Sequence, residues 1–150
     1  MITEKLPVRA VKIPLTSKDK ASIIDELVQL LCDVYSLDFY DEILDSVLER
    51  EEMMSTGVGF GIAIPHAKND KITAPKMVAG IAENGIYFDS IDHRPAKIFF
   101  LLVSPKNDSG EHVRILSELS RILNNPKARD EVAAAIDGQQ LVDALHRFEG

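Results

Sequence analysis

Three side chains in this sequence have types and positions suited to handling an anionic group. The first is His66, which follows the apolar run Ile62-Ala63-Ile64 and Pro65. A predicted strand that ends at a proline would leave this imidazole rigidly held at the edge of a sheet and open to a ligand. A neutral imidazole is a nucleophile near pH 7, because its ordinary pKa is about 6.5. Position alone does not separate a reactive His66 from a solvated or structurally hydrogen-bonded one.

His112 and Arg50 are the other two candidates. His112 falls in the first turn of a predicted helix, where unpaired backbone N–H groups and the helix dipole favour an anion. Arg50 lies at the polar end of another predicted helix, and its planar guanidinium group suits phosphate oxygens. Each has a plainer explanation. His112 would be a buried histidine bonded to the backbone, and Arg50 would pair at the surface with Glu49, Glu51 or Glu52.

Three glycines at alternate positions, Gly57, Gly59 and Gly61, precede the strand that leads to His66. They do not form a dinucleotide-binding fingerprint, because Ile62 occupies the place of its last glycine and a strand follows instead of a helix. No Lys-Ser or Lys-Thr pair follows them, which excludes a P-loop. The loop is therefore either a tight turn or a segment whose backbone approaches a ligand closely.

Zinc-protease, structural-zinc and hydrolase motifs are absent: the sequence has no His-Glu-x-x-His, no Cys-x-x-Cys and no Gly-x-Ser-x-Gly. A metal ion held between His66 and His112 stays open as an alternative without a motif. The net charge of −7 opposes nucleic-acid binding. No apolar stretch approaches the roughly 20 residues that cross a bilayer, and the single Cys32 cannot form an internal disulfide, so we expect a cytoplasmic protein without direct membrane insertion.

The elements that must position these residues follow from apolar spacing. Apolar residues at intervals of three and four predict helices over 18–35, 39–53 and 108–123, and two shorter helices after Asn125-Pro126 and after Gly138. Short apolar runs predict strands near 8–15, 62–66, 77–82, 86–88 and 98–103, the last typical of a buried central strand. We therefore expect one α/β (α+β) domain over residues 1–150, the first eight loose, with a mixed sheet of about five strands flanked by helices on both sides.

The stretch Leu48-Glu49-Arg50-Glu51, followed by Ser55-Thr56-Gly57 and the run from Val58 to His66, closely resembles the active-site signature of enzyme IIA domains of the bacterial phosphotransferase system. The resemblance is to the fructose, mannitol and nitrogen-regulatory (PtsN-like) branch. Gly85-Ile86-Tyr87-Phe88, the strand 98–103 with Ser104-Pro105, and His112 before a leucine-rich helix resemble the same family in the same order. One departure is Phe60, where family members commonly have asparagine.

This resemblance implies that His66 is the phosphorylated histidine, His112 the second active-site histidine and Arg50 the site arginine. It also makes Thr56 and the backbone of Gly59 and Gly61 candidate phosphate contacts. It implies a phosphotransferase that takes a phosphoryl group from the phosphocarrier HPr, or its nitrogen-branch counterpart, and needs no metal or diffusible cofactor. The second ring nitrogen of His66 should be hydrogen-bonded, which would fix the tautomer.

Three functions remain open at this point. A free-standing chain favours a nitrogen-regulatory enzyme IIA, whose phosphorylation state changes its affinity for a regulatory protein target. The alternative in the same family is a sugar-transport enzyme IIA that passes the phosphoryl group to an enzyme IIB. Outside this class stands a binding module that has lost phosphotransfer and holds an anion or a metal ion.

Overall fold

The continuous apolar run in the second half of the chain forms the central strand of a sheet. The computed structural model describes all 150 residues. Strand β6 (Ala96–Pro105) is buried from Ile98 onward and pairs antiparallel with β5 (Lys76–Ile86) on one side. On its other side it pairs in parallel with β3 (Ile62–Ala63) and β4 (His66–Asn69). A strand paired on both edges and covered on both faces must be apolar throughout, which is why the sequence signal was a continuous run.

Two short strands complete the sheet. Strand β1 (Val11–Lys12) adds in parallel to β5, and β2 (Gly57–Gly59) pairs antiparallel with β3. The order is β1-β5-β6-β3-β2, with β4 pairing only with β6. The prediction of a mixed sheet of about five strands is confirmed.

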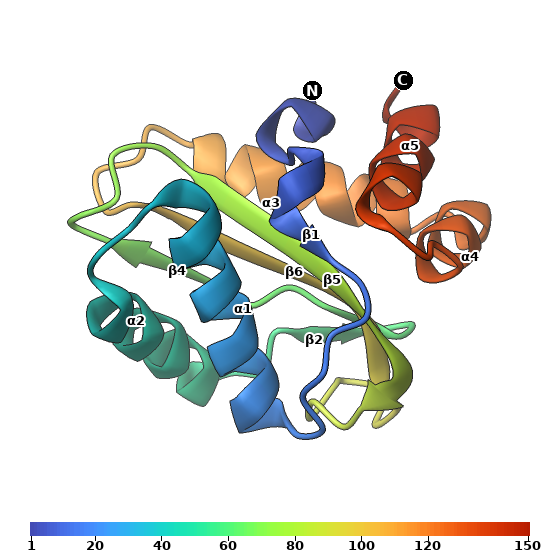
Figure 1. Cartoon of the computed structure of the whole chain (residues 1–150), viewed down its shortest axis with the longest axis horizontal. Helices are drawn as coiled ribbons and strands as arrows, with labels where there is room; N and C mark the ends of the chain where they lie inside the picture. The colour runs from blue at the N-terminus through green and yellow to red at the C-terminus, as the bar shows by residue number, and fades with distance from the viewer.

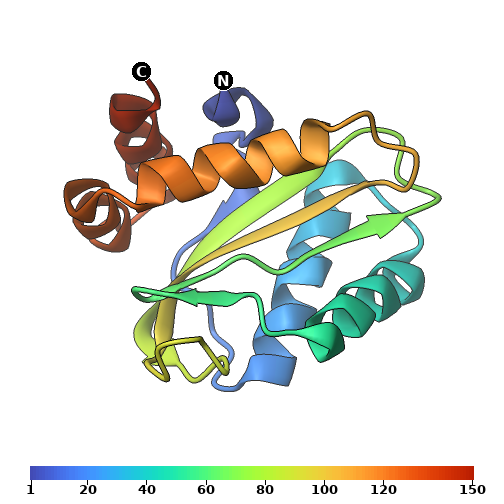
Figure 2. The same ribbon diagram turned by 180° about the vertical axis from the view of Figure 1, so that it is seen from behind.

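Helices cover both faces of the sheet, as predicted. Helices α1 (Lys20–Tyr35) and α2 (Tyr40–Met53) lie against one face (Figure 1), and α3 (Glu111–Leu123) crosses the other (Figure 2). The shorter α4 (Pro126–Ala133) and α5 (Gly138–Glu149) follow α3 and lie beside its end. Asn125 caps α4 by accepting the N–H of Lys127, as the Asn-Pro pair predicted.

Several boundaries differ from those expected. Helix α1 begins at Lys20 because Asp19 caps it, its side chain accepting the N–H of Ser22. Gly85, which separates the expected strands 77–82 and 86–88, lies inside β5 with φ +74°, where the pairing with β6 shifts register. Only Ile86 of the expected strand 86–88 pairs, as the last residue of β5.

The first residues are more ordered than the sequence suggested. Two 3₁₀ helices, η1 (Ile2–Lys5) and η2 (Val8–Ala10), replace the loose terminus and the start of the strand expected near 8–15, of which only Val11–Lys12 forms a strand. Ile2 and Leu6 are buried with 3% and 1% exposure, so apolar burial holds this segment against the domain.

The strand leading to His66 does not end at Pro65. Ile62 pairs with Ile98 and His66 pairs with Leu102, so β3 and β4 run along one edge of β6 in one unbroken register. Pro65 has no N–H to donate, but its carbonyl still accepts the N–H of Leu102 at 3.1 Å. His66 therefore opens β4 instead of closing β3, and pairing on both sides of the proline holds its backbone.

Candidate functional site

The structure brings His66, His112 and Arg50 together in one cleft of about 410 Å³. Helix α2 and strand β4 pack against each other, and His112, near the start of α3, lines the same cleft. The three residues were proposed from separate stretches of sequence, and the fold makes them neighbours. The complete lining is Ser46, Glu49, Arg50, Met53, His66, Ala67, Lys68, Lys106 and His112.

The parallel pairing of β4 and β6 explains how the two histidines meet. In this pairing His66 lies opposite Leu102, two residues before Ser104, whose hydroxyl is bonded to His112. A short connection then leads into α3, whose second residue is His112. The two imidazole centroids lie 5.5 Å apart with the rings tilted by 59°.

His66 is half-buried and has one ring nitrogen engaged. Its Nδ1 lies 2.7 Å from the carbonyl oxygen of Ile64. A carbonyl can only accept, so the neutral ring carries its proton on Nδ1 and the lone pair on Nε2. Burial and then the positive charge of Arg50 lower the pKa of His66, while its bond to Ile64 and the charge of Glu51 oppose the shift. The ring is therefore neutral at pH 7, with Nε2 as the nucleophilic atom.

His112 is more deeply buried, with 5% exposure, and its partner is a side chain. Its Nδ1 lies 2.6 Å from the hydroxyl oxygen of Ser104, which is itself fully buried. Burial, with the nearby charges of His66 and Lys68, lowers the pKa of His112 to about 4. His112 is therefore also neutral at pH 7. When Ser104 donates to Nδ1, the ring proton lies on Nε2, the second nitrogen, and can be donated to an anion.

Arg50 makes none of the ion pairs with neighbouring glutamates that its position had suggested. Its Nη1 donates to the carbonyl of Met54 at 2.8 Å, and no carboxylate lies within ion-pair distance. Glu51 instead binds Lys20 and Thr56. The guanidinium group thus forms no ion pair, and it is close enough to His66 to lower the pKa of that ring. This arrangement suits a group that arrives as a dianion.

Thr56, Gly59 and Gly61 do not line the cleft that holds the histidines. Thr56 is buried and spends its N–H and hydroxyl on Glu51. Gly59 and Gly61, with φ +91° and +77°, form the tight turn between β2 and β3, and the Gly61 carbonyl accepts the N–H groups of Lys97 and Ile98. Of the two interpretations left open for the glycine loop, the structure favours the tight turn.

Phe60, the residue that departs from the family pattern, lies at the tip of this hairpin. It has φ +57° and 68% exposure, and the guanidinium of Arg129 lies 4.5 Å from its ring centroid. It does not line the cleft of His66.

Sequence reasoning missed two cations and one hydroxyl of the site. Lys68 lies two residues after His66, and side chains at that spacing on a strand share a side, so the strand pattern contained a usable signal. Lys106 follows β6 and completes the rim. Ser104 had no signal of its own, because its role depends on how β6 meets α3.

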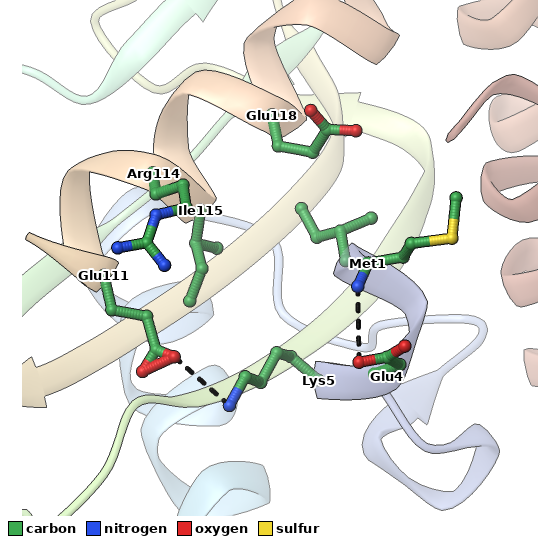
Figure 3. Close-up of a pocket in the computed structure, with 8 residues that line it drawn as sticks. Met1, Glu4, Lys5, Glu111, Arg114, Ile115 and Glu118 are labelled. Carbon is green, nitrogen blue, oxygen red and sulfur yellow. Dashed lines mark ion pairs between the residues drawn. The ribbon is translucent and has the colours of Figure 1, made fainter. Parts of the chain in front are cut away.

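No cluster of three or more histidine, cysteine, aspartate or glutamate side chains is placed to hold a metal ion. A cleft of about 490 Å³ between η1 and α3 is lined mostly by charged groups, some of which form ion pairs with each other (Figure 3). There Lys5 lies 3.4 Å from Glu111, and the amino group of Met1 lies 3.3 Å from Glu4. It contains no histidine or other nucleophile comparable to His66.

Comparison with known proteins decides the family. The family model described as phosphoenolpyruvate-dependent sugar phosphotransferase system, EIIA 2, matches residues 4–147. The chain belongs to this EIIA family. The resemblance drawn from the residues around His66 is thereby confirmed. None of its helices is long and apolar enough to cross a membrane.

EIIA relatives of both the transport and the regulatory kind are similar to this chain. The fructose-specific EIIA component from Haloferax volcanii is 37% identical over 139 residues, which are 93% of this chain and 90% of that protein. The crystal structure of nitrogen regulatory protein IIA-Ntr from Neisseria meningitidis has a TM-score of 0.89 and 26% identity, covering 96% of this chain and 98% of that one.

A third EIIA protein is similar in fold alone. Enzyme IIA mannitol from Escherichia coli, in its complex with phosphorylated enzyme IIB mannitol, is 18% identical with a TM-score of 0.82, covering 95% of this chain and 98% of that one.

Proposed function

We propose that this chain is a phosphoryl carrier that accepts the group on Nε2 of His66 and passes it on. The observation that supports this most directly is the bond from Nδ1 of His66 to the Ile64 carbonyl, which leaves the Nε2 lone pair as the reactive position. Arg50, Lys68 and Lys106 line the same cleft and supply positive charge for a dianionic group.

The chemistry proposed is an in-line displacement at phosphorus. The bond from phosphorus to the donor nitrogen breaks while a bond to Nε2 of His66 forms, and the imidazole gains positive charge as it attacks. The Ile64 carbonyl accepts the Nδ1–H and stabilises that charge. Because the transition state spreads charge over the equatorial oxygens, the remaining task is electrostatic, and Arg50 and neutral His112 are placed to donate to those oxygens.

The proposed donor is the phosphohistidine of HPr or of its nitrogen-branch counterpart. The proposal includes a cytoplasmic location, with which the free, buried thiol of Cys32 is compatible. The test is intact mass before and after incubation with phosphoenolpyruvate, enzyme I and either phosphocarrier. One acid-labile phosphoryl group that is lost in His66→Ala is the expected result. Failure with both donors would leave the anion-binding module as the better explanation.

His112 has a separate test. His112→Ala should still accept one phosphoryl group but more slowly, by about 10²-fold if one transition-state donor is lost. The measurement is the rate of phosphorylation from the donor that labels the wild-type chain. Transfer at the full rate would remove His112 from the mechanism.

Two branches of the family supply the acceptor. The sequence favoured the nitrogen-regulatory branch on the ground that the chain stands alone. The fructose-specific relative, however, is matched over 90% of its own length, so length does not separate the branches. Transfer of the phosphoryl group to a fructose-type enzyme IIB supports sugar transport. Binding of a target protein in only one phosphorylation state supports regulation.

A further inference from the structure

Glu51 is a buried carboxylate close to the site, and the proposed transfer gives it no role. It lies in the last turn of α2, next to Arg50, and its side chain is only 5% exposed. One oxygen, Oε1, accepts the N–H of Thr56 at 2.9 Å and lies 3.0 Å from Nζ of Lys20. The other, Oε2, accepts the Thr56 hydroxyl at 2.6 Å. Both oxygens are therefore occupied by donors.

A buried ion pair is a weak source of stability, because removing two charges from water costs about as much as their attraction returns. Lys20 is shared with a second carboxylate, Asp89 at 3.2 Å, and its Nζ lies 4.8 Å from the ring centroid of Phe88. The cation is thus held in place from three directions. The ordered contacts of Glu51 and Lys20 are therefore better explained by the groups that they orient than by a contribution to the free energy of unfolding.

A chain of hydrogen bonds leads from this carboxylate to the reactive imidazole. Glu51 fixes Thr56 through two bonds. The Thr56 carbonyl accepts the N–H of Ile64 at 3.0 Å. The Ile64 carbonyl in turn lies 2.7 Å from Nδ1 of His66. Each link holds the backbone of the next residue, so that the direction of the Ile64 carbonyl depends on the position of Thr56.

We propose that Glu51 is a positioning residue for His66, acting through Thr56 and Ile64 to hold the imidazole with its proton on Nδ1 and Nε2 free to react. This inference rests on the proposed role of His66 as phosphoryl acceptor. Because a carbonyl in a fixed direction selects one tautomer and one ring orientation, a residue that fixes the carbonyl also selects the nucleophilic nitrogen.

The two charges nearest to His66 act on its pKa in opposite senses. Arg50 favours the neutral ring and Glu51 opposes it, while His112 is the titratable neighbour across the cleft. Glu51 thus compensates part of the Arg50 charge at the imidazole without pairing with Arg50. Removing only the Glu51 charge should therefore lower the pKa of His66.

Glu51→Gln tests the proposal, with Glu52→Gln as the matched control. Glutamine has one acceptor oxygen, so its NH₂ group must face one of the donors that the carboxylate satisfies. Glu52 is the next residue on α2 and is exposed. The readouts are the ¹⁵N shifts of the His66 ring, which report tautomer and pKa without any donor protein, and the second-order rate constant of phosphorylation.

In Glu51→Gln we expect the Nε2–H tautomer to rise, the pKa of His66 to fall and the rate to fall about tenfold, as for a misplaced reacting group. Glu52→Gln should stay within about twofold of wild type in that rate. Unchanged ¹⁵N shifts in folded Glu51→Gln would overturn the inference. If the wild-type chain accepts no phosphoryl group, the proposed function fails, but the ring shifts still decide the role of Glu51.

Thr56 variants keep the proposal testable if Glu51→Gln does not fold. Thr56→Val removes only the hydroxyl donor and should shift the His66 tautomer in the same direction by a smaller amount. Thr56→Ser restores the hydroxyl and should restore the wild-type ¹⁵N shifts and rate. Valine and serine variants with the same His66 shifts would contradict the link through Thr56, since only one of them has the hydroxyl.

Discussion

The two histidines of the cleft differ in the hydrogen-bond partner of Nδ1. His66 faces a carbonyl, which leaves one definite nucleophilic nitrogen, whereas His112 faces a hydroxyl that can donate or accept. Both are neutral at pH 7 because burial disfavours the charged ring. At the residue scale the site is a pair of neutral imidazoles beside the cations Arg50, Lys68 and Lys106, an arrangement that suits the proposed transfer of a phosphoryl group to His66.

Buried His112 should make the protein sensitive to acid. Its pKa is about 4 in the folded state and about 6.5 when unfolded, so the unfolded chain gains a proton first as the pH falls. Above pH 6.5 the buried His112 does not lower the free energy of unfolding, because the ring is neutral in both states. Between pH 6.5 and 4 the free energy of unfolding should drop by on the order of 2 kcal/mol. Urea unfolding at pH 7 and pH 4.5 checks this. His112→Gln should show a smaller drop than wild type, and equal drops would contradict the assignment.

Arg50 should matter for the rate of transfer and little for folding. Its one hydrogen bond is to the Met54 carbonyl at the end of its own helix, so the free energy of unfolding of Arg50→Gln should change by less than about 1 kcal/mol. Phosphorylation should slow by about 10²-fold, because a cation near the transferring group is lost. Arg94→Gln, an exposed change outside the cleft, is the control. A comparable slowing in both variants would point to a general loss of charge.

At the scale of elements, the site depends on three segments that end near one another: the last turn of α2, the start of β4 and the first turn of α3. The β2–β3 hairpin lies outside the cleft and contacts the site through Thr56. It holds Thr56 at its base, and Thr56 connects Glu51 to the backbone that bonds His66. The glycines of the hairpin therefore act on the site through backbone packing, since they lie outside the cleft.

Gly57→Ala should destabilise the protein by disturbing the packing of the hairpin backbone. A Cβ at residue 57 would lie 2.4 Å from Oγ of Ser90 and 2.9 Å from its Cα, so backbone must move. We expect a loss of about 1–3 kcal/mol in the free energy of unfolding, measured by urea denaturation. Gly61→Ala gives a contrast: its Cβ would meet nothing closer than 4.0 Å, and only the φ of +77° opposes it, at a cost of about 1 kcal/mol. A larger loss in Gly61→Ala than in Gly57→Ala would show that conformation, not crowding, dominates here.

At the scale of the whole molecule, the two ends of the chain are fastened together. Glu149, in the last turn of α5, is 4% exposed and accepts both the N–H and the hydroxyl of Thr3. His146 lies 2.9 Å from the same carboxylate. These bonds and the burial of Ile2 explain why the first residues are not loose, which apolar spacing alone could not show.

Glu149→Gln should loosen both ends of the chain. The hydrogen bonds to Thr3 lower the pKa of Glu149 against the effect of burial, so its contribution is present at neutral pH and is lost as the pH falls through that lowered pKa. We expect a loss of about 1–2 kcal/mol at pH 7, with faster amide exchange in residues 2–6. Glu4→Gln, which alters an exposed pair with the amino group of Met1, is the control and should have little effect. Equal amide exchange in both variants would refute the fastening role.

The sequence by itself determined the elements and the family. Apolar periodicity predicted α1, α2, α3 and the central strand β6, because each must bury one stripe or two faces whatever lies around it. The motif around His66 determined the EIIA family and named the two histidines and the arginine. Those residues can be recognised in a sequence because the chemistry of the site requires a histidine or an arginine at each of these positions.

Only the tertiary structure decided which atoms of the site residues contact one another. It showed that Glu51 binds Thr56 and Lys20 instead of Arg50, that β4 continues past Pro65, and that the Ile64 carbonyl meets Nδ1 of His66. The Glu51 bonds join α1, α2 and the segment before β2, the β4 pairing is with β6, and the local bond of His66 to Ile64 needs the backbone direction that this pairing sets. Apolar spacing cannot encode them, because a hydrogen bond depends on the direction of two groups that only the packed sheet brings together.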